Sequence, residues 1–321
     1  MRVLYWARLA LGKAQIIERL SAVPGCELVV AETTDAALAA LPDADAIVLY
    51  DAPVADANRI VEAVRAAPRL RWMHFVSAGR EGFEAAGLPP PGVAVSWAAG
   101  GVAPTVAEHA MALLLALARR VPEMVTQGLA SRWDRALASR ARSLEGATIA
   151  IVGTGHIGIG IAQRARAFGM RTVGVSRRAA ADAALDESRP LAELHAVLAR
   201  ADAVAIAIAL GAETRHLIGR AELAACKPGA LLVNIARGGI IHQPALVEAL
   251  HSGRIGGAGL DVTDPEPLPE NDPLWRAPNV LISPHFAGGG SAASIARLAD
   301  GAADNLRRLI DGRSLANLVG R

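Results

Sequence analysis

Short, nearly continuous apolar runs alternate with longer stretches of helical periodicity along most of the chain. In the first part, strand candidates lie at 2–6, 27–31, 46–50 and 71–75, and helical spacing marks 13–20 and 56–66. A second series of strand candidates lies at 147–152, 171–175, 203–208, 230–235, 256–261 and 279–282. Strands that are apolar throughout are typical of parallel sheets covered on both faces. The pattern therefore predicts an α/β fold built from βαβ units.

Two further helix candidates lie outside these series, one between them and one after the second. Residues 105–120 form a helix candidate whose interior is nearly all apolar, which predicts a helix buried on most sides. The last helix candidate, 291–310, follows the glycine break 288–290. With 321 residues, the chain is long enough for two domains.

Charge and cysteine content exclude several classes of function. The formal net charge is +2, and no run of Lys or Arg suggests a nucleic-acid surface. Cys26 and Cys226 stand far apart, without the spacing of a zinc site, so we expect reduced thiols and no metal. The longest apolar stretch, 110–118, is too short for a membrane span, which needs ~20 residues. These features predict a cytoplasmic protein without membrane or nucleic-acid partners.

A GxGxxG segment directly follows the strand candidate 147–152 and opens a helix candidate at 157–168. In this context Gly153 permits a tight turn, Gly155 lets the backbone approach a pyrophosphate, and Gly158 lets the helix pack near the strand. Amide groups at the helix start, around His156 and Ile157, are then available to the phosphates. The segment predicts a dinucleotide site.

The next strand carries no acid at its end to bind a ribose 2′-hydroxyl. Ser176, Arg177 and Arg178 stand there instead, and the first acid is Asp182. Guanidinium and hydroxyl groups bind a 2′-phosphate that a carboxylate would repel. We therefore expect NADP(H), with NAD(H) as the alternative in which both Arg side chains are simply solvated.

Three ionisable residues follow predicted strands of the second series: Arg237, Glu266 and His285. Ligands of open α/β sheets bind beyond the carboxyl ends of the strands, so these side chains could converge at the nicotinamide. Arg237 can bind the carboxylate of a 2-keto acid through its planar fork. His285 can protonate the oxygen that receives negative charge on reduction, and Glu266 beside it would raise its pKa. The predicted activity is reduction of a 2-keto acid.

These motifs together resemble the D-isomer-specific 2-hydroxyacid dehydrogenase family. The resemblance runs from about residue 70 to 290. It rests on the glycine segment and on 76–79 (Val-Ser-Ala-Gly), 106–109 (Val-Ala-Glu-His), 234–239, 259–267 with 272–275, and 283–285 (Ser-Pro-His).

The resemblance implies two Rossmann-like doubly wound domains with a cleft between them. The substrate domain would comprise 1–98 and 288–321, and the NAD(P)-binding domain 99–287; homodimers would form through the latter. Backbone N–H groups of Ala78 and Gly79 would hold the substrate carboxylate together with Arg237. Further residues match family positions around the coenzyme: Thr105, Ile235, Ala236, Asp261, Ala287 and Gly288.

The chain departs from the family after Gly79, where a small apolar residue and Asp are usual and Arg80-Glu81 stand instead. Arg80 could touch a second acidic group of the substrate or be a solvated loop residue. Trp6, Tyr50 and Asp51 could line the pocket or serve packing alone.

Glyoxylate and hydroxypyruvate are the first expectation for the substrate, and the product would be a D-2-hydroxy acid. A reductase of a bulkier 2-keto acid is one alternative. Another, from a different class, is a dinucleotide-sensing corepressor-like binding protein, because such relatives retain much of the site. Turnover of any 2-keto acid would separate the enzyme from the binding protein.

Overall fold

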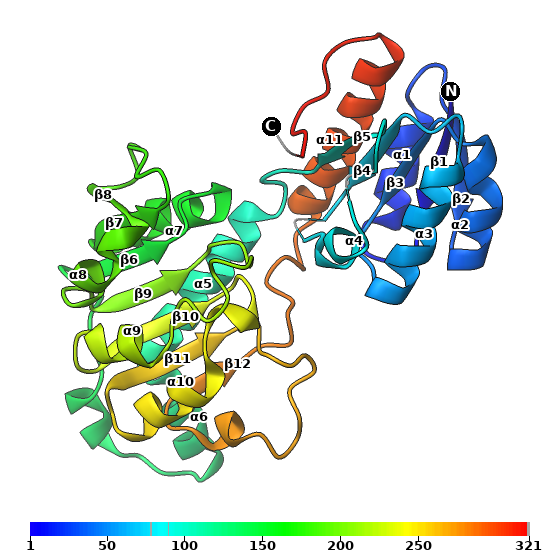
Figure 1. The fold of residues 1–321 in the computed structure, drawn as a ribbon. Helices are drawn as coiled ribbons and strands as arrows, with labels where there is room; N and C mark the ends of the chain where they lie inside the picture. Colours follow the sequence, from blue (N-terminus) through cyan, green and yellow to red (C-terminus); the bar gives the residue numbers. More distant parts are fainter. Residues whose placement is uncertain (78, 89, 320–321) are drawn as a thin grey trace. The chain divides into compact units, whose positions relative to one another are not determined.

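The computed structural model describes residues 1–77, 79–88 and 90–319. The chain forms two compact units, Met1–Val102 together with the segment from Gly290 onward, and Ala103–Gly289. Each unit contains one parallel sheet covered by helices on both faces (Figure 1), which confirms the predicted α/β class. No helix within the described ranges is both long and apolar enough to cross a bilayer.

The first unit is built on a five-stranded sheet with the order β2-β1-β3-β4-β5. Its strands are β1 (Arg2–Trp6), β2 (Glu27–Ala31), β3 (Ala46–Leu49), β4 (Trp72–Phe75) and β5 (Ala94–Trp97). Its helices are α1 (Lys13–Ser21), α2 (Thr34–Ala40), α3 (Val54–Ala66), α4 (Glu81–Ala85) and α11 (Ala292–Ile310). Alternate residues of the strands face opposite cores: one core packs against α2, α3 and α4, and the other against α1 and α11.

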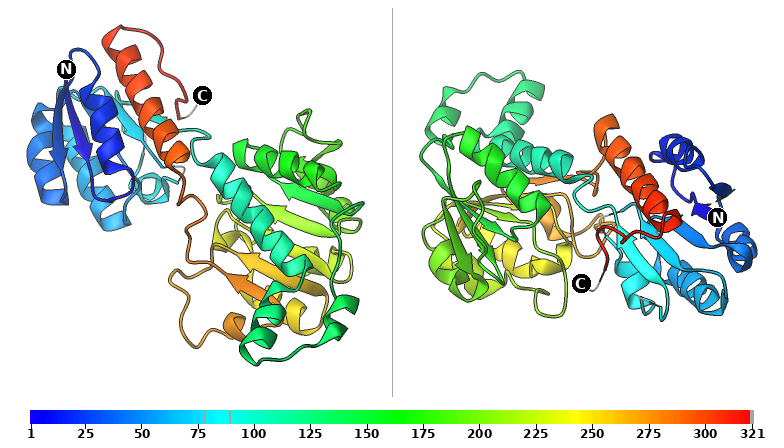
Figure 2. Two further views of the ribbon diagram at one scale, coloured as in Figure 1. Left: turned by 180° about the vertical axis from the view of Figure 1, so that it is seen from behind. Right: turned by 90° about the horizontal axis from the view of Figure 1, so that it is seen from above.

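The second unit is built on a seven-stranded sheet with the order β12-β11-β10-β9-β6-β7-β8. Its strands are β6 (Thr148–Val152), β7 (Arg171–Ser176), β8 (Glu187–Pro190), β9 (Ala203–Ile206), β10 (Ala230–Asn234), β11 (Ile255–Leu260) and β12 (Val280–Ile282). Its α-helices are α5 (Ala103–Ala118), α6 (Val121–Leu129), α7 (His156–Ala167), α8 (Leu194–Leu198), α9 (Arg220–Ala225) and α10 (Gln243–His251). Helices α5 and α7 cover one face of this sheet, and α8, α9 and α10 cover the other (Figure 2).

The predicted elements are present, with ends that differ by one or two residues. The buried helix predicted over 105–120 is α5, which begins at Ala103 and ends at Ala118. Two strands were not predicted. Strand β5 has only four residues, and β8 consists of polar residues and a proline. Strand β8 lies at the edge of its sheet, where polar residues and proline are tolerated because one side of the strand is not hydrogen bonded.

Because all strands within each sheet are parallel, their carboxyl ends lie along one edge. In the second unit this edge gathers the segments after β6, β7, β10, β11 and β12. These are the segments that carry the predicted coenzyme and catalytic residues.

Candidate active site

The glycine turn follows β6 and leads directly into α7. Gly153 has a φ of 100°, and a Cβ there would lie 2.5 Å from the backbone nitrogen of Ile208. A Cβ on Gly158 would lie 1.9 Å from the carbonyl oxygen of Gly153. The protein's own packing therefore requires both glycines.

Gly155 is different. Its φ is −77°, and a Cβ on it would meet no protein atom within 4 Å. Neither backbone conformation nor internal packing explains a glycine at this N-cap position. A ligand that approaches the backbone closely does explain it, and the adjacent first turn of α7, with exposed His156 and half-buried Ile157, offers amide groups to an anion. The turn thus fits a dinucleotide pyrophosphate.

Ser176, the last residue of β7, lies beside this turn, because the Gly153 amide donates to the carbonyl of Val175 at 2.8 Å. Arg177 and Arg178 follow, and both side chains are exposed. Neither has a hydrogen-bond or ion-pair partner in the part of the chain that the structure describes. Two cationic side chains without an internal partner therefore stand next to the phosphate-binding turn.

Glu266 and His285 form a direct contact, with 2.8 Å between Oε2 of Glu266 and Nδ1 of His285. The hydrogen bond to Glu266 raises the pKa of His285 above its usual value. Burial opposes the ionisation of Glu266, but the bonds from His285 and from the Thr263 amide hold its pKa below the usual range. Both shifts favour the imidazolium–carboxylate form of the pair, with Nε2 of His285 left to face a ligand.

Arg237 belongs to the same cluster, since its charge acts on both members of the pair. Buried Asn234 shapes the loop that carries Arg237. Its amide group donates to the Arg237 carbonyl at 2.9 Å and accepts from the Ala236 amide at 3.1 Å. A Cβ on Gly238 would lie 1.9 Å from the Thr263 carbonyl, so the loops after β10 and β11 pack tightly together. The structure thus brings the three predicted catalytic residues together.

The loop that carries His285 is organised by Asp261, which is 2% exposed. Its carboxylate accepts from Ser283 Oγ at 2.6 Å and from the amides of Phe286 and Ala287 at 3.1 and 3.0 Å. Its carbonyl accepts from the His285 amide at 2.9 Å. These bonds hold His285 at a φ of 52°, in the left-handed region that non-glycine residues seldom adopt.

His109 on α5 completes this network, although the sequence gave it no role of its own. Its Nε2 lies 2.9 Å from Ser283 Oγ, and its ring packs edge-on against Phe286, with 5.0 Å between the ring centroids. Ser283 donates its single hydroxyl proton to Asp261, because an ionised carboxylate can only accept. The His109 nitrogen must then carry a proton and donate it to Ser283. The one available signal was a histidine and a glutamate within an otherwise apolar helix.

Other predicted coenzyme positions surround this region. Ile235 and Ala287 are buried, Thr105, Ala236 and Gly288 are half-buried, and Asp261 is occupied by the bonds described above.

The predicted carboxylate loop lies in the first unit. Ala78 is outside the described residues. Ser77 Oγ donates to the carbonyl of Gly79 at 2.8 Å and accepts from the Asp51 amide at 3.1 Å, so the loop is fixed to the segment after β3. Trp6 is 1% exposed and packs against Phe83 within the core.

Tyr50 and Asp51 are also engaged inside the first unit. Tyr50 is 6% exposed, and its hydroxyl donates to the Leu11 carbonyl at 2.8 Å. Asp51 Oδ2 accepts from the Gly82 amide at 3.3 Å. The structure therefore gives Trp6 and Tyr50 packing roles.

Comparisons with known proteins agree with this arrangement. Residues 111–287 match the model of the D-isomer specific 2-hydroxyacid dehydrogenase NAD-binding domain. The chain is 40% identical over 258 residues to glyoxylate/hydroxypyruvate reductase B of Pectobacterium atrosepticum, covering 79% of this chain and 80% of the relative.

Solved structures agree as well. A D-isomer specific 2-hydroxyacid dehydrogenase family protein from Aeromonas salmonicida superposes with a TM-score of 0.85 at 28% identity, covering 99% of this chain and 98% of that one. A second, from Xanthobacter autotrophicus and in complex with NADPH, has a TM-score of 0.80 at 25% identity and covers 99% and 98%. The chain belongs to the D-isomer specific 2-hydroxyacid dehydrogenase family and is a nicotinamide-dependent oxidoreductase.

Proposed function

We propose that the protein reduces glyoxylate to glycolate and hydroxypyruvate to D-glycerate, with NADPH as the favoured coenzyme. The observation that carries this proposal is the Glu266–His285 pair within the field of Arg237. Relatives named glyoxylate/hydroxypyruvate reductase support the choice of substrates. They also favour an enzyme over the dinucleotide-sensing binding protein.

The residues divide the work of such a reduction. A bound reduced nicotinamide coenzyme would supply the hydride for the keto carbon. Arg237 binds the substrate carboxylate through two parallel N–H groups. His285 holds a proton on Nε2 and donates it to the keto oxygen as negative charge develops there. Glu266 keeps the ring oriented and charged, because it bonds Nδ1.

Coenzyme binding is assigned to the 103–289 unit, which also carries Arg237, whereas the 76–79 loop that the family resemblance assigns to the substrate carboxylate belongs to the other unit. The match of 111–287 to an NAD-binding domain supports the first assignment. NADPH preference is supported by exposed Arg177 and Arg178 beside the glycine turn, and by the NADPH complex of the Xanthobacter relative. We further propose a cytoplasmic location, as expected for a nicotinamide-dependent metabolic enzyme with free cysteines.

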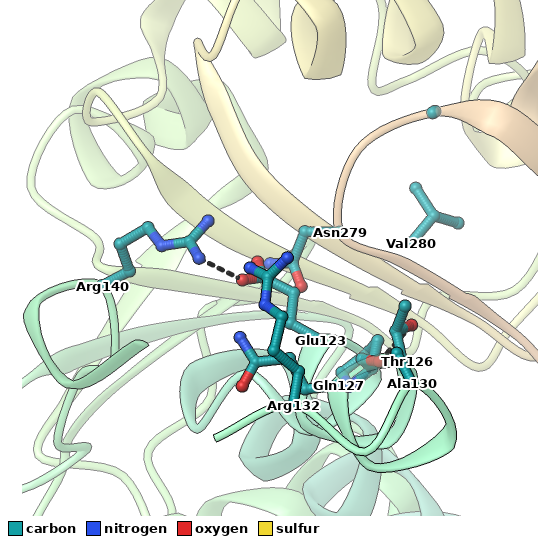
Figure 3. Close-up of a pocket in the computed structure, with 10 residues that line it drawn as sticks. Glu123, Thr126, Gln127, Ala130, Arg132, Arg140, Asn279 and Val280 are labelled. Carbon is teal, nitrogen blue, oxygen red and sulfur yellow. Dashed lines mark hydrogen bonds and ion pairs between the residues drawn. The ribbon is translucent and has the colours of Figure 1, made fainter. Parts of the chain in front are cut away.

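We also propose that the protein is a homodimer joined through α6 and the segment after it. Four large apolar side chains are exposed there: Met124, Val125, Leu129 and Trp133, the last 92% exposed. Beside them is an open pocket lined by Glu123, Gln127 and Asn279, among others, where Arg140 pairs with Glu123 at 2.8 Å (Figure 3). Such an exposed apolar surface is typical of an interface. Sedimentation of the wild type and of Trp133→Glu would test it, with a monomeric variant expected.

The decisive experiment follows the absorbance of the reduced nicotinamide with glyoxylate, hydroxypyruvate, pyruvate and phenylpyruvate, each with NADPH and with NADH. We expect glyoxylate and hydroxypyruvate to be reduced fastest, with NADPH preferred. Replacing Arg177 and Arg178 by Gln should raise KM for NADPH by roughly tenfold or more and leave KM for NADH nearly unchanged. Equal effects on both coenzymes would overturn the 2′-phosphate site, and no turnover of any keto acid would overturn the proposed reaction.

A further inference from the structure

Arg80 stands directly after Gly79, where the family resemblance leads one to expect a small apolar residue. It is the N-cap residue of α4, and its side chain is 18% exposed. The guanidinium carbon lies 5.2 Å from the ring centroid of Trp97, at the end of β5. A solvated loop residue would not be held against an aromatic ring in this way, so the position of this side chain is fixed by the fold.

Most of the hydrogen-bonding capacity of Arg80 is left for a ligand. A guanidinium has five N–H donors. One terminal nitrogen lies 3.0 Å from Oε1 of Glu84, and the buried Nε has no partner in the described part of the chain. Glu84 itself is 49% exposed, and such solvated i,i+4 pairs are weak and easily exchanged. In the described part of the chain Arg80 pairs with Glu84 and not with Asp51, whose Oδ2 accepts from the Gly82 amide of α4.

The location of this cation relates it to the substrate. Gly79 belongs to the loop assigned to the substrate carboxylate, and that loop is anchored by Ser77. Consecutive Cα atoms are only 3.8 Å apart, so the Arg80 side chain starts next to the group that binds the first carboxylate. It can therefore reach the far end of a short substrate held there.

We propose that Arg80 binds a second anionic group on the substrate, so that the enzyme favours 2-keto dicarboxylates over monocarboxylates of the same length. This inference rests on the proposed 2-keto acid reduction and adds a preference among longer substrates than glyoxylate: at equal chain length, a second carboxylate makes the better substrate. Because Nε is itself buried, the anion would bond terminal N–H groups of the guanidinium side by side, in the planar fork that suits a carboxylate. Trp97 keeps the guanidinium plane in place before the substrate arrives, which limits the entropy lost on binding.

The test compares matched substrates. Oxaloacetate is paired with 2-ketobutyrate and 2-ketoglutarate with 2-ketovalerate, so that each pair differs by a carboxylate in place of a methyl group. We expect kcat/KM with NADPH to be at least ~10-fold higher for the dicarboxylate, mainly through KM. Arg80→Leu should reduce this ratio to about one or below, and Arg80→Lys should leave an intermediate ratio, since it keeps the charge without the fork.

The ratio within each variant is the readout, because any disturbance of the carboxylate loop affects both substrates of a pair alike. Glu84→Gln is the complementary variant: it removes the competing carboxylate and should raise the ratio, whatever the fate of the Arg80 variants. Reduction of monocarboxylates with no preference for the second carboxylate would overturn this inference alone. If neither Arg80→Leu nor Glu84→Gln changes the preference for dicarboxylates, Arg80 does not cause that preference. No reduction of any 2-keto acid would overturn the proposed function itself.

Discussion

At the scale of single residues, the hydrogen bond between Glu266 and His285 shifts the protonation equilibrium of the histidine toward the imidazolium. Reduction consumes a proton, so it requires the imidazolium, whereas oxidation requires the neutral ring. Because Glu266 raises the pKa of His285, the imidazole of His285 stays protonated at a higher pH than that of an isolated histidine. Activity in the direction of reduction should therefore fall as pH rises through this raised pKa.

Glu266→Gln should move that decline to lower pH. Glutamine preserves the size of the side chain but not its charge, so the pKa of His285 should fall. We expect kcat/KM for glyoxylate at pH 8 to drop by roughly tenfold, with a smaller loss at pH 5.5.

The reverse reaction is the control for this prediction. Oxidation of the 2-hydroxy acid by the same variant should begin at lower pH than in the wild type, because less base is needed to free the ring. If the variant's activity is lower at every pH but its pH dependence is unchanged, Glu266 only orients the histidine.

At the scale of elements, the position of His285 depends on contacts between segments that lie far apart in the sequence. His109 on α5 bonds Ser283 across a separation of 174 residues, and Ser283 bonds Asp261 after β11. Motifs in the sequence predicted Arg237, Glu266 and His285 because each follows a strand of a parallel sheet. No local sequence pattern reports a hydrogen bond between distant side chains, so the bonds of His109, Ser283 and Asp261 that hold the His285 loop could not be predicted.

His109 should therefore act as a positioning residue for His285. His109→Leu removes the N–H donor to Ser283 and the ring that packs on Phe286, so the loop has less to hold the left-handed backbone at His285. We expect kcat to fall by about tenfold, since small displacements of a catalytic group are costly. The pH at which reduction declines should not move, because the Glu266–His285 contact remains.

His109→Gln is the matched control, since its amide can still donate to Ser283. It should recover a clear part of the lost kcat, while circular dichroism shows both variants to be folded. If the glutamine variant is no better than leucine, the hydrogen bond has no part in the effect and only packing remains.

At the scale of the whole chain, strand and helix patterns predicted two series of βαβ units, and the structure contains two sheets of that kind. Short or polar edge strands such as β5 and β8 were missed, because an edge strand lacks the continuous apolar run of a buried one. The points at which the chain passes between the units, near residues 102 and 290, carry no proline-rich or charged linker that marks them in the sequence.

The division into units has a consequence for stability, because the tryptophans are distributed unevenly. Trp6 and Trp72 are at most 1% exposed and lie in the first unit, whereas Trp133 and Trp275 of the second are 92% and 50% exposed. Intrinsic fluorescence should therefore change mainly when the first unit unfolds, while calorimetry reports both. If coenzyme binds only the second unit, NADPH at ~100 times its Kd should raise the calorimetric transition of that unit by on the order of 5–10 °C.

The fluorescence midpoint should move much less than the calorimetric one, since a ligand stabilises only the unit whose folded state it binds. The double replacement of Arg177 and Arg178 by Gln supplies the control: it should diminish the effect of NADPH and preserve that of NADH. Equal shifts of fluorescence and heat absorption would mean that the two units unfold as one or share the coenzyme. The prediction that the 103–289 unit both binds the coenzyme alone and unfolds independently would then be wrong.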